Sequence, residues 1–231
     1  MRLDDLIPAG GEGHGIDVAL QRADDLDLAA LTFIQSRVDD GKAPRALDLA
    51  GGSGGQGVRM AKAGAEVIVS DILARGDDVA QLAKANHVSG KVRFVQADMA
   101  DLSCAFAQEN SLFDVIVCQR AIHYLPYKKA QKALEGIKRI LAEEGRLYLS
   151  ASGIYSELGE GYPAKKTSIE ERFAPLAEDM ANHHNILQPV SLYAQDDLRK
   201  ALEDAGFKVE KLFSSSFGNI KAIATPGRQN G

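Results

Sequence analysis

The sequence contains no tryptophan, two cysteines and six tyrosines among its 231 residues. Two cysteines are too few for a disulfide-stabilised scaffold, and the scarcity of Trp and Tyr argues against a membrane-interface belt or a platform for stacking bases. No apolar run approaches the ~20 residues that a membrane span needs. Lys and Arg number 27 against 32 Asp and Glu, a net charge of −5 that disfavours duplex nucleic acid as a partner.

What is present is typical of a globular protein, with 45% hydrophobic and 26% charged residues. The first residues, MRLDDLIPAGGEGHG, have neither the basic start nor the apolar core of a secretory signal. We therefore expect a cytoplasmic protein with reduced thiols and no membrane partner. Its length suits one large domain, and its oligomeric state is left open.

Short apolar segments alternate with helical patterns through the middle of the chain. Strands are predicted at residues 46–49, 66–70, 92–95, 113–118 and 146–150. Helices are predicted at residues 55–63, 79–86 and 130–141, the last ended by Gly145. Such alternation predicts right-handed crossovers, a mostly parallel sheet, and ligand binding at the carboxyl ends of its strands.

Both flanks of this core depart from the alternation. Residues 1–45 contain one predicted helix, at 25–38, and form an N-terminal cap or lid. Residues 151–192 interrupt the pattern after the fifth strand, with a helical stretch near 169–180. Residues 193–225 carry a helix at 196–205 and two strand-like segments, 208–213 and 219–225, whose short joint suits an antiparallel pair. We therefore predict one α/β domain with its cofactor-binding half at 46–150.

A glycine-rich loop follows the first predicted strand and precedes a helix. It reads LDLAGGSGGQG over residues 47–57, and Gly52, Gly54 and Gly57 fit G-x-G-x-x-G. Glycines at such a turn let the backbone approach a ligand closely, as Gly51 could also do. Asp71 ends the second strand, where a carboxylate can accept both ribose hydroxyls of an adenosine ligand or cap the next helix.

Two further acids narrow the class of cofactor. Asp48 lies inside the first strand, where it would repel a pyrophosphate but could hold the ammonium of a sulfonium cofactor. Asp98 ends the third strand and could accept the adenine amino group, with Met99 beside the ring. The alternative for Asp98 is again a helix cap.

In this order the motifs resemble the class I S-adenosylmethionine-dependent methyltransferases. LDLAGGSGG resembles the family's first motif, with Ala50 where its first glycine usually stands, and VSDI resembles the second-strand motif, with Ile72 against adenine. The resemblance covers about residues 40–225. It implies a doubly wound, mostly parallel seven-stranded sheet of order 3-2-1-4-5-7-6, with strand 7 antiparallel. It also implies S-adenosyl-L-methionine as cofactor and S-adenosyl-L-homocysteine as product.

The implied reaction is an in-line attack of an O, N, S or C nucleophile on the sulfonium methyl group, which depends mainly on proximity and alignment. His123, just past the fourth strand, is the candidate general base, although it could instead pack under the active-site loop or touch the cofactor carboxylate. Gln119 and Arg120 follow the same strand and could contact cofactor or substrate, or cap backbone groups.

The loops and the insertion supply the candidates for contact with the acceptor. These are His14, Arg120, Tyr124, Tyr155, Tyr162 and His183. His183 and His184 are adjacent and lie ~100° apart in a helix. We therefore expect solvated histidines there rather than a metal site with Asp179.

The fourth strand is not followed by the Asn/Asp-Pro-Pro-Tyr/Phe motif of amino-directed DNA methyltransferases, so a small or medium organic acceptor is expected. Two alternatives stay open. A non-catalytic partner or regulator could retain the same fold. A short-chain dehydrogenase would need Tyr-x-x-x-Lys on one helix. That spacing occurs at Tyr124/Lys128 and Tyr162/Lys166, but a proline interrupts each pair.

Overall fold

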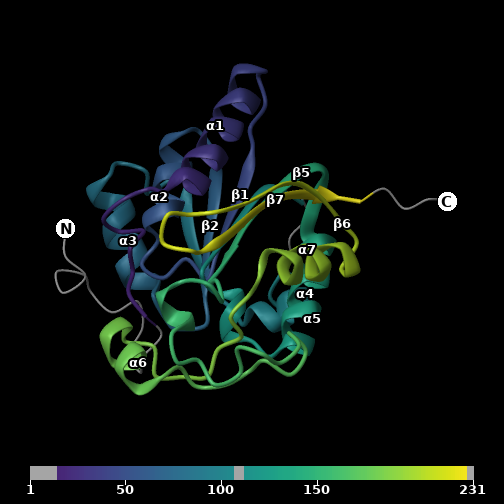
Figure 1. Cartoon of the computed structure of the whole chain (residues 1–231). Coiled ribbons are helices and arrows are strands. Elements are labelled where there is room, and N and C mark those ends of the chain that lie inside the picture. Colours follow the sequence, from purple (N-terminus) through teal and green to yellow (C-terminus); the bar gives the residue numbers. More distant parts are fainter. Residues whose placement is uncertain (1–14, 107–111, 228–231) are drawn as a thin grey trace.

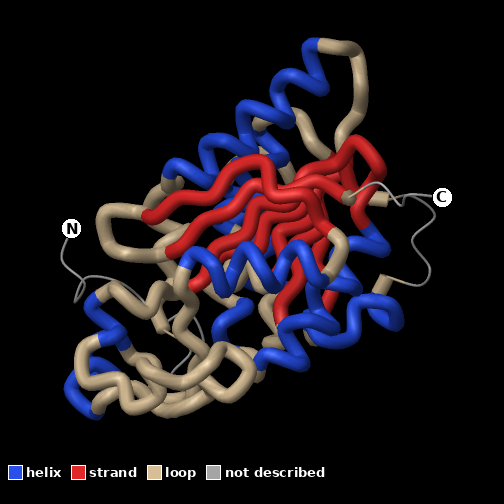
Figure 2. The backbone as a smooth tube through the Cα atoms, turned by 45° about the vertical axis from the view of Figure 1, so that its right-hand side comes forward, coloured by secondary structure: helices blue, strands red, loops and turns tan. Residues whose placement is uncertain are grey.

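Seven strands form a single sheet in the order β3-β2-β1-β4-β5-β7-β6 (Figures 1 and 2). The computed structural model describes residues 15–106 and 112–227. Neighbouring strands run parallel except where β7 lies antiparallel between β5 and β6. The predicted fold class, strand order and antiparallel seventh strand are therefore confirmed.

The strands are β1 (Arg45–Leu49), β2 (Glu66–Asp71), β3 (Val92–Gln96), β4 (Phe113–Gln119), β5 (Leu141–Ala151), β6 (Phe207–Ser214) and β7 (Ile220–Pro226). The helices are α1 (Asp25–Asp39), α2 (Gly55–Lys62), α3 (Gly76–Ala85), α4 (Leu102–Ala105), α5 (Tyr127–Ile140), α6 (Glu178–His184) and α7 (Gln195–Asp204). Short 3-10 turns are η2 (Met99–Asp101), η3 (Ile122–Tyr124) and η4 (Glu157–Gly159). No helix in the described ranges is long and apolar enough to cross a membrane.

Helices cover both faces of the sheet, which explains why its central strands read as continuous apolar runs. Successive side chains of a strand point to opposite faces. Leu47 and Leu49 of β1 accordingly pack with residues of α4, α5 and α7. Ala46 of the same strand packs on the other face, with residues of α1, α2 and α3. The buried faces hold the strands in register, so that the carboxyl ends of the parallel strands meet at one edge.

The fifth strand begins earlier than predicted. Helix α5 ends at Ile140, and β5 starts at Leu141, so Gly145 lies inside β5 instead of ending the helix. Phe113 of β4 pairs with Leu141, whereas Val115 already pairs with Arg146, so the register shifts between them. A Cβ at Gly145 would lie 2.9 Å from the carbonyl oxygen of Phe113, and this close approach explains the glycine.

Residues 151–192 form a loop-rich lobe beside the sheet, visible as mostly tan tube in Figure 2. The helix predicted near 169–180 is wrong, because only Glu178–His184 is helical. Ala174 instead forms an isolated bridge with Val190, as expected before Pro175, which disfavours helical backbone at the preceding residue. The lobe has a small core of its own, made by Ile154, Leu158, Tyr162, Ala164, Leu176, Ile186, Val190 and Leu192.

Candidate functional site

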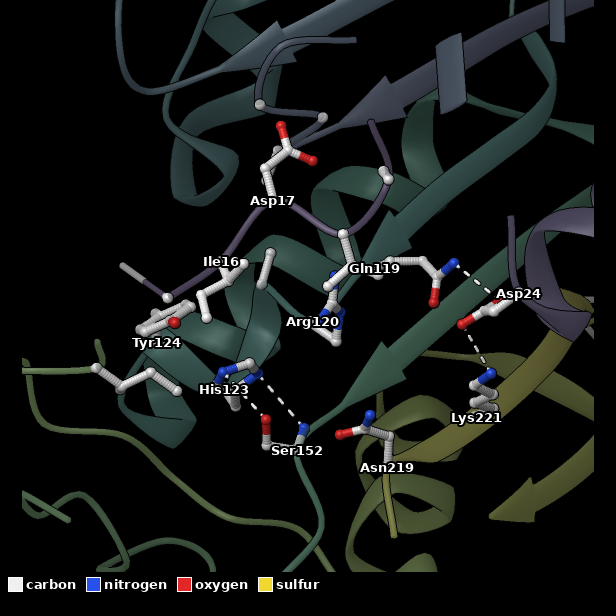
Figure 3. Close-up of a pocket in the computed structure, with 18 of the residues that line it drawn as sticks. Ile16, Asp17, Asp24, Gln119, Arg120, His123, Tyr124, Ser152, Asn219 and Lys221 are labelled. Carbon is white, nitrogen blue, oxygen red and sulfur yellow. Dashed lines mark hydrogen bonds and ion pairs between the residues drawn. The ribbon is translucent and has the colours of Figure 1, made fainter. Parts of the chain in front are cut away.

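A cavity of about 1490 Å³ lies at the carboxyl edge of the sheet. Its walls come from the glycine loop after β1, the ends of β2 and β4, residues 15–25, the 151–192 lobe and the turn between β6 and β7 (Figure 3). Open α/β sheets bind ligands at this edge, where connections from neighbouring strands leave in opposite directions. The fold thus brings the predicted motifs to one place.

The glycine loop needs glycine at several points. Gly52 and Gly54 have φ of 55° and 84°, a left-handed backbone that favours glycine, and a Cβ on Gly51 would lie 2.6 Å from Cγ of Asp48. Ala50 also has a positive φ, of 54°. Ala50 stands where the family's first glycine usually stands, and this left-handed backbone costs an L-residue roughly 1–2 kcal/mol.

Asp48 organises this loop from below. It is buried, and its Oδ2 accepts a hydrogen bond from the Gly57 amide at 2.7 Å. Burial raises the pKa of Asp48 to about 7, with further contributions from the carboxylates of Asp27, Asp17 and Asp71. The side chain lines the cavity, so it can change charge close to neutral pH in response to a bound cation. Its contact with a cofactor ammonium stays a prediction.

Asp71 lies at the end of β2 with both oxygens on backbone amides. Oδ2 accepts from Gly52 at 3.0 Å and Oδ1 from Leu73 at 2.9 Å. Each oxygen has a second acceptor site, so the carboxylate can still receive two ribose hydroxyls. Ile72 beside it is 55% exposed and lines the cavity, an apolar surface of the kind that an adenine ring would cover.

Asp98 and Met99 line the same part of the cavity. Asp98 accepts a hydrogen bond from the Ala100 amide at 2.8 Å and so caps η2, which is the alternative role considered for it. Met99 packs half-buried against the main core. Both residues are placed beside Ile72 and Ala97 in the cavity wall, and their contact with adenine stays a prediction.

Gln119, at the end of β4, is already fully engaged within the protein. Its Nε2 donates to Asp27 at 2.6 Å and to Asp24 at 3.2 Å, and its Oε1 accepts from the Ser150 hydroxyl at 3.0 Å. These bonds tie the start of α1 to the sheet. The cofactor contact predicted for Gln119 stays a prediction, whereas its positioning role is observed.

A buried lysine completes this network and was not found from the sequence. Lys221 of β7 donates to Asp24 at 2.8 Å and to Asp25, joining β7 to the first turn of α1 (Figure 3). Burial alone would raise the pKa of Asp24, but its hydrogen bonds and Lys221 lower it below the usual range. Burial raises the pKa of Asp27. The available signal was a lone lysine in the apolar strand IKAIATP.

Asp17 is a second residue that the sequence did not indicate. It lies in the segment before α1 and is nearly buried, and its Oδ2 lies 3.3 Å from the Ser53 amide of the glycine loop. Gly15, near the start of the same segment, donates to the carbonyl of Asn185 at 2.7 Å. The segment therefore crosses the cavity from the glycine loop to the 151–192 lobe, a path that no local pattern predicts.

His123 is buried, and both of its ring nitrogens face Ser152 (Figure 3). Nδ1 lies 3.4 Å from the Ser152 amide, and Nε2 lies 3.3 Å from the Ser152 hydroxyl. Burial lowers the pKa of His123 to about 3, and the nearby Arg120 lowers it further. An imidazole so difficult to protonate is a poor general base at neutral pH. Its low pKa is unfavourable for that role, and its burial against Ser152 suits the alternative of packing under the site.

The candidates for acceptor contact divide into two groups. Arg120, Tyr124, Tyr155 and His183 line the cavity, and Tyr155 is 81% exposed. Tyr162 does not line it, because its hydroxyl points into the lobe toward the backbone carbonyls of Arg172 at 2.9 Å and Val190 at 2.6 Å. The prediction that Tyr162 contacts the acceptor is therefore wrong. The sequence could not show it, because the residue type alone does not tell whether a tyrosine faces inward. His14 lies outside the described residues.

The same geometry removes the Tyr-Lys pairs of a dehydrogenase. Tyr162 is held in the lobe's own core, away from the cavity. Tyr124 lies in η3, whereas Lys128 lies in α5, and Pro126 stands between them as the residue before that helix. The lysine of such a pair can lower the pKa of the tyrosine only if both lie on one continuous helix, and neither pair does.

The fold and the site together define an α/β domain with a cavity at the carboxyl edge of its sheet, lined by a glycine loop and by carboxylates of neighbouring strands. Residues 46–145 match the family model described as methyltransferase domain. The stretch therefore resembles a methyltransferase domain, and the fold implied by the resemblance to the class I S-adenosylmethionine-dependent methyltransferases is confirmed by the strand order and by the solved structures.

Solved structures show the same fold at low sequence identity. An S-adenosylmethionine-dependent methyltransferase from Clostridium acetobutylicum is 14% identical, with a TM-score of 0.66, covering 92% of this chain and 96% of that one. The 1,6-didemethyltoxoflavin-N1-methyltransferase of Burkholderia thailandensis, with bound 1,6-didemethyltoxoflavin and S-adenosylhomocysteine, is 16% identical, with a TM-score of 0.63 and coverages of 92% and 80%.

An O-methyltransferase family protein of Burkholderia thailandensis is 16% identical, with a TM-score of 0.62. The alignment covers 89% of this chain but 57% of that protein, so this chain spans little more than half of its length. A search of curated proteins by sequence gave no match.

Proposed function

We propose that the protein transfers the methyl group of S-adenosyl-L-methionine to a nucleophilic atom of a small or medium organic molecule. One observation carries the proposal. At the stretch that matches a methyltransferase domain, one cavity joins the glycine loop, three aspartates in or just after β1, β2 and β3, and a wall built by residues outside the matched stretch. The first two features suit the cofactor, and the third suits a separate acceptor.

The cofactor fits the strand side of the cavity by its chemistry. Asp71 would accept the ribose hydroxyls, Ile72 and Met99 would contact adenine, and Asp98 would receive its amino group. The methionine portion would lie along the glycine loop, with its ammonium toward Asp48. Negative charge from three aspartates would balance a ligand that carries both a sulfonium and an ammonium.

Arg120 supplies the complementary charge. Its side chain points into the cavity (Figure 3), and its backbone is fixed by hydrogen bonds from its amide to the carbonyl and hydroxyl of Ser150, both at 3.0 Å. The guanidinium has no ion-pair partner within the described ranges. It would therefore bind a carboxylate, either that of the cofactor or one on the acceptor.

Methyl transfer then needs mainly alignment. The bound cofactor would supply an activated methyl group to a lone pair of the acceptor placed opposite sulfur; the electrons of the broken C–S bond would stay on sulfur to give S-adenosyl-L-homocysteine, and any proton of the acceptor would pass to water. Holding both reactants in line and away from water supplies most of the acceleration. His123, neutral and bonded to Ser152, would position the loop after β4 rather than remove a proton.

The size of the cavity supports two ligands. Single-ligand pockets range over roughly 300–1,000 Å³, and this cavity measures about 1490 Å³. The similarly folded toxoflavin methyltransferase holds a small heterocyclic acceptor together with S-adenosylhomocysteine.

Cys104 is exposed and Cys118 is buried, and both are free thiols, which suits the reducing cytoplasm that we propose as the location of the protein.

Calorimetry with S-adenosyl-L-methionine and S-adenosyl-L-homocysteine tests the cofactor, and mass spectrometry of the purified protein tests whether either is retained. We expect binding with one site per chain. Methyl-labelled cofactor incubated with a panel of small phenols, acids, amines and thiols then tests turnover. Absence of binding would reject the proposal, and binding without any methylated product would favour the non-catalytic alternative.

A further inference from the structure

Three metal-ligating side chains of the 151–192 lobe converge on the cavity. They are Glu157 of η4 and His183 and His184 of α6, and one ligand atom from each lies within 4.8 Å of the others. All three residues line the cavity. The two imidazole rings, expected to diverge, lie with centroids 4.8 Å apart in an edge-to-face arrangement.

One donor in this cluster has no conventional partner. Nε2 of His184 is buried and has no hydrogen bond of good geometry among the described residues, although it faces the Glu157 carboxylate. It lies 3.4 Å from Oε2 of Glu157. Donors about 2.1 Å from a tetrahedral zinc ion lie about 3.4 Å from one another. The spacing of this pair is therefore that of two ligands of one ion, and the ligand atom of the exposed His183 lies within 4.8 Å of both.

We propose that Glu157, His183 and His184 form a site for a divalent transition-metal ion of the Zn²⁺ type. Two imidazoles and one carboxylate favour such an ion over Mg²⁺ or Ca²⁺, which prefer oxygen ligands. Asp179 is not part of the site, since its carboxylate bonds the Met180 amide instead. Three protein ligands leave a coordination position open, as in metal sites that bind a substrate or water.

The open position would face the acceptor. If the proposed methyl transfer holds, an oxygen of the acceptor can occupy it, and a bound metal ion favours the deprotonated form of a hydroxyl group. This would supply the activation that the buried His123 is unsuited to give. The site thus points to an acceptor with a hydroxyl, phenol or enol oxygen, and this refinement rests on the proposed function.

The test uses the full chain without a histidine tag, stripped of metal by a chelator. Co²⁺ alone is titrated and followed by its visible absorption, and Zn²⁺ alone is titrated by calorimetry. We expect one equivalent of either ion to bind. H183A, H184A and E157Q should each lose more affinity than the roughly 10–100-fold lost when a residue that only supports a ligand is removed.

Two variants serve as matched controls. His87→Ala removes an exposed histidine after α3, outside the cavity, and Asp179→Asn changes an acid on α6 itself. Both should bind the ion as the parent protein does. Binding that survives H183A and H184A, or no stoichiometric binding at all, would overturn the proposal and leave an ion pair between His184 and Glu157.

Affinity for S-adenosyl-L-homocysteine, measured on the same samples, separates the two proposals. If it persists in every variant, the variants are folded and the cofactor assignment stands whatever the metal result. If the parent protein binds Zn²⁺ at this cluster but not the cofactor, the proposed function fails and the metal site stands.

Discussion

The two walls of the cavity are held in place by different means. On the strand side, backbone geometry does the work: Gly52 and Gly54 adopt left-handed conformations, and Asp48 and Asp71 accept hydrogen bonds from the loop's own amides. On the lobe side, a small core and side chains that reach backbone carbonyls hold residues 151–192. The lobe could therefore change sequence without disturbing the sheet, which suits a wall that selects the acceptor.

Arg172 gives the largest test of this difference. It is buried, its guanidinium lies 2.6 Å from Asp197 of α7, and it donates to the carbonyls of Thr167 and Leu192. Arg172→Met removes the donor to the two carbonyls and the ion-pair partner of Asp197, which keeps only the Ala194 amide, so we expect a loss of about 3–5 kcal/mol in the free energy of unfolding. Denaturant unfolding measures it, and calorimetry should show that the remaining folded protein still binds S-adenosyl-L-homocysteine.

Arg199→Ala is the matched control. Arg199 pairs with Glu203 one helical turn away, and both side chains are about half exposed. Its loss should change stability by no more than about 0.5 kcal/mol. If Arg172→Met instead abolished cofactor binding in protein that remained folded, the two walls would not be separable.

Asp71 tests the strand side. Asp71→Ala removes two hydrogen bonds to the ribose, each worth about 1.5–3 kcal/mol when the acceptor is charged. We expect affinity for S-adenosyl-L-homocysteine to fall by about 100-fold or more, measured by calorimetry. Asp71→Asn keeps one acceptor oxygen for the loop and should lose less. Unchanged affinity in Asp71→Ala would reject its assignment to the ribose.

The two walls of the cavity also differ in how well their residues could be predicted from the sequence. Asp48, Asp71 and Asp98 were located because strand ends and glycine loops leave local patterns, and parallel strands bring their carboxyl ends together. Tyr162 was misplaced because its burial depends on packing that no local period records.

Tertiary pairing explains the residues that were missed. Lys221 meets Asp24 across 197 positions of sequence, and Asp17 meets Ser53 across 36. Each of these contacts depends on the finished fold, since no local pattern marks Lys221 or Asp17 as the partner of its distant residue. The strand order, in contrast, was implied by the resemblance of the ordered motifs to the methyltransferase family, and it is confirmed.

Asp48 should make the affinity for the cofactor depend on pH. In the free protein its pKa is about 7, and a cofactor ammonium beside it would favour the ionised form. Binding should therefore release a proton from Asp48 below pH 7. The affinity for S-adenosyl-L-methionine should rise about tenfold from pH 5.5 to 7. The α-amino group of the cofactor, with a pKa of about 7.7–8.0, stays protonated over this range, so the change reports on Asp48. Calorimetry in buffers of different ionisation enthalpy measures both quantities.

Asp48→Asn is the control for this effect, and it should flatten the pH dependence. The stability of the free protein gives an independent check. Because the folded pKa of Asp48 lies above its unfolded value, its contribution is fully present below about pH 4 and is lost as pH rises to 7. The contribution of His123 to the free energy of unfolding depends on pH in the opposite direction. Its folded pKa of about 3 makes its contribution complete above about pH 6.5 and lost at lower pH. A pH-independent affinity in the parent protein would contradict the placement of the ammonium.

Ala50 offers the smallest effect and the most direct test of backbone control on the strand side. Its φ of 54° costs an L-residue roughly 1–2 kcal/mol, whereas glycine there would lose only its greater freedom in the unfolded chain, worth about 0.5–1 kcal/mol. Ala50→Gly should therefore raise the free energy of unfolding by up to about 1 kcal/mol and leave cofactor affinity equal or higher. Ala85→Gly, in the last turn of α3 with ordinary helical backbone, should lower it by about 0.5–1 kcal/mol. If the two substitutions lowered the free energy of unfolding equally, the loop would not be strained at Ala50. Side-chain contacts rather than backbone conformation would then hold the strand side of the cavity in place.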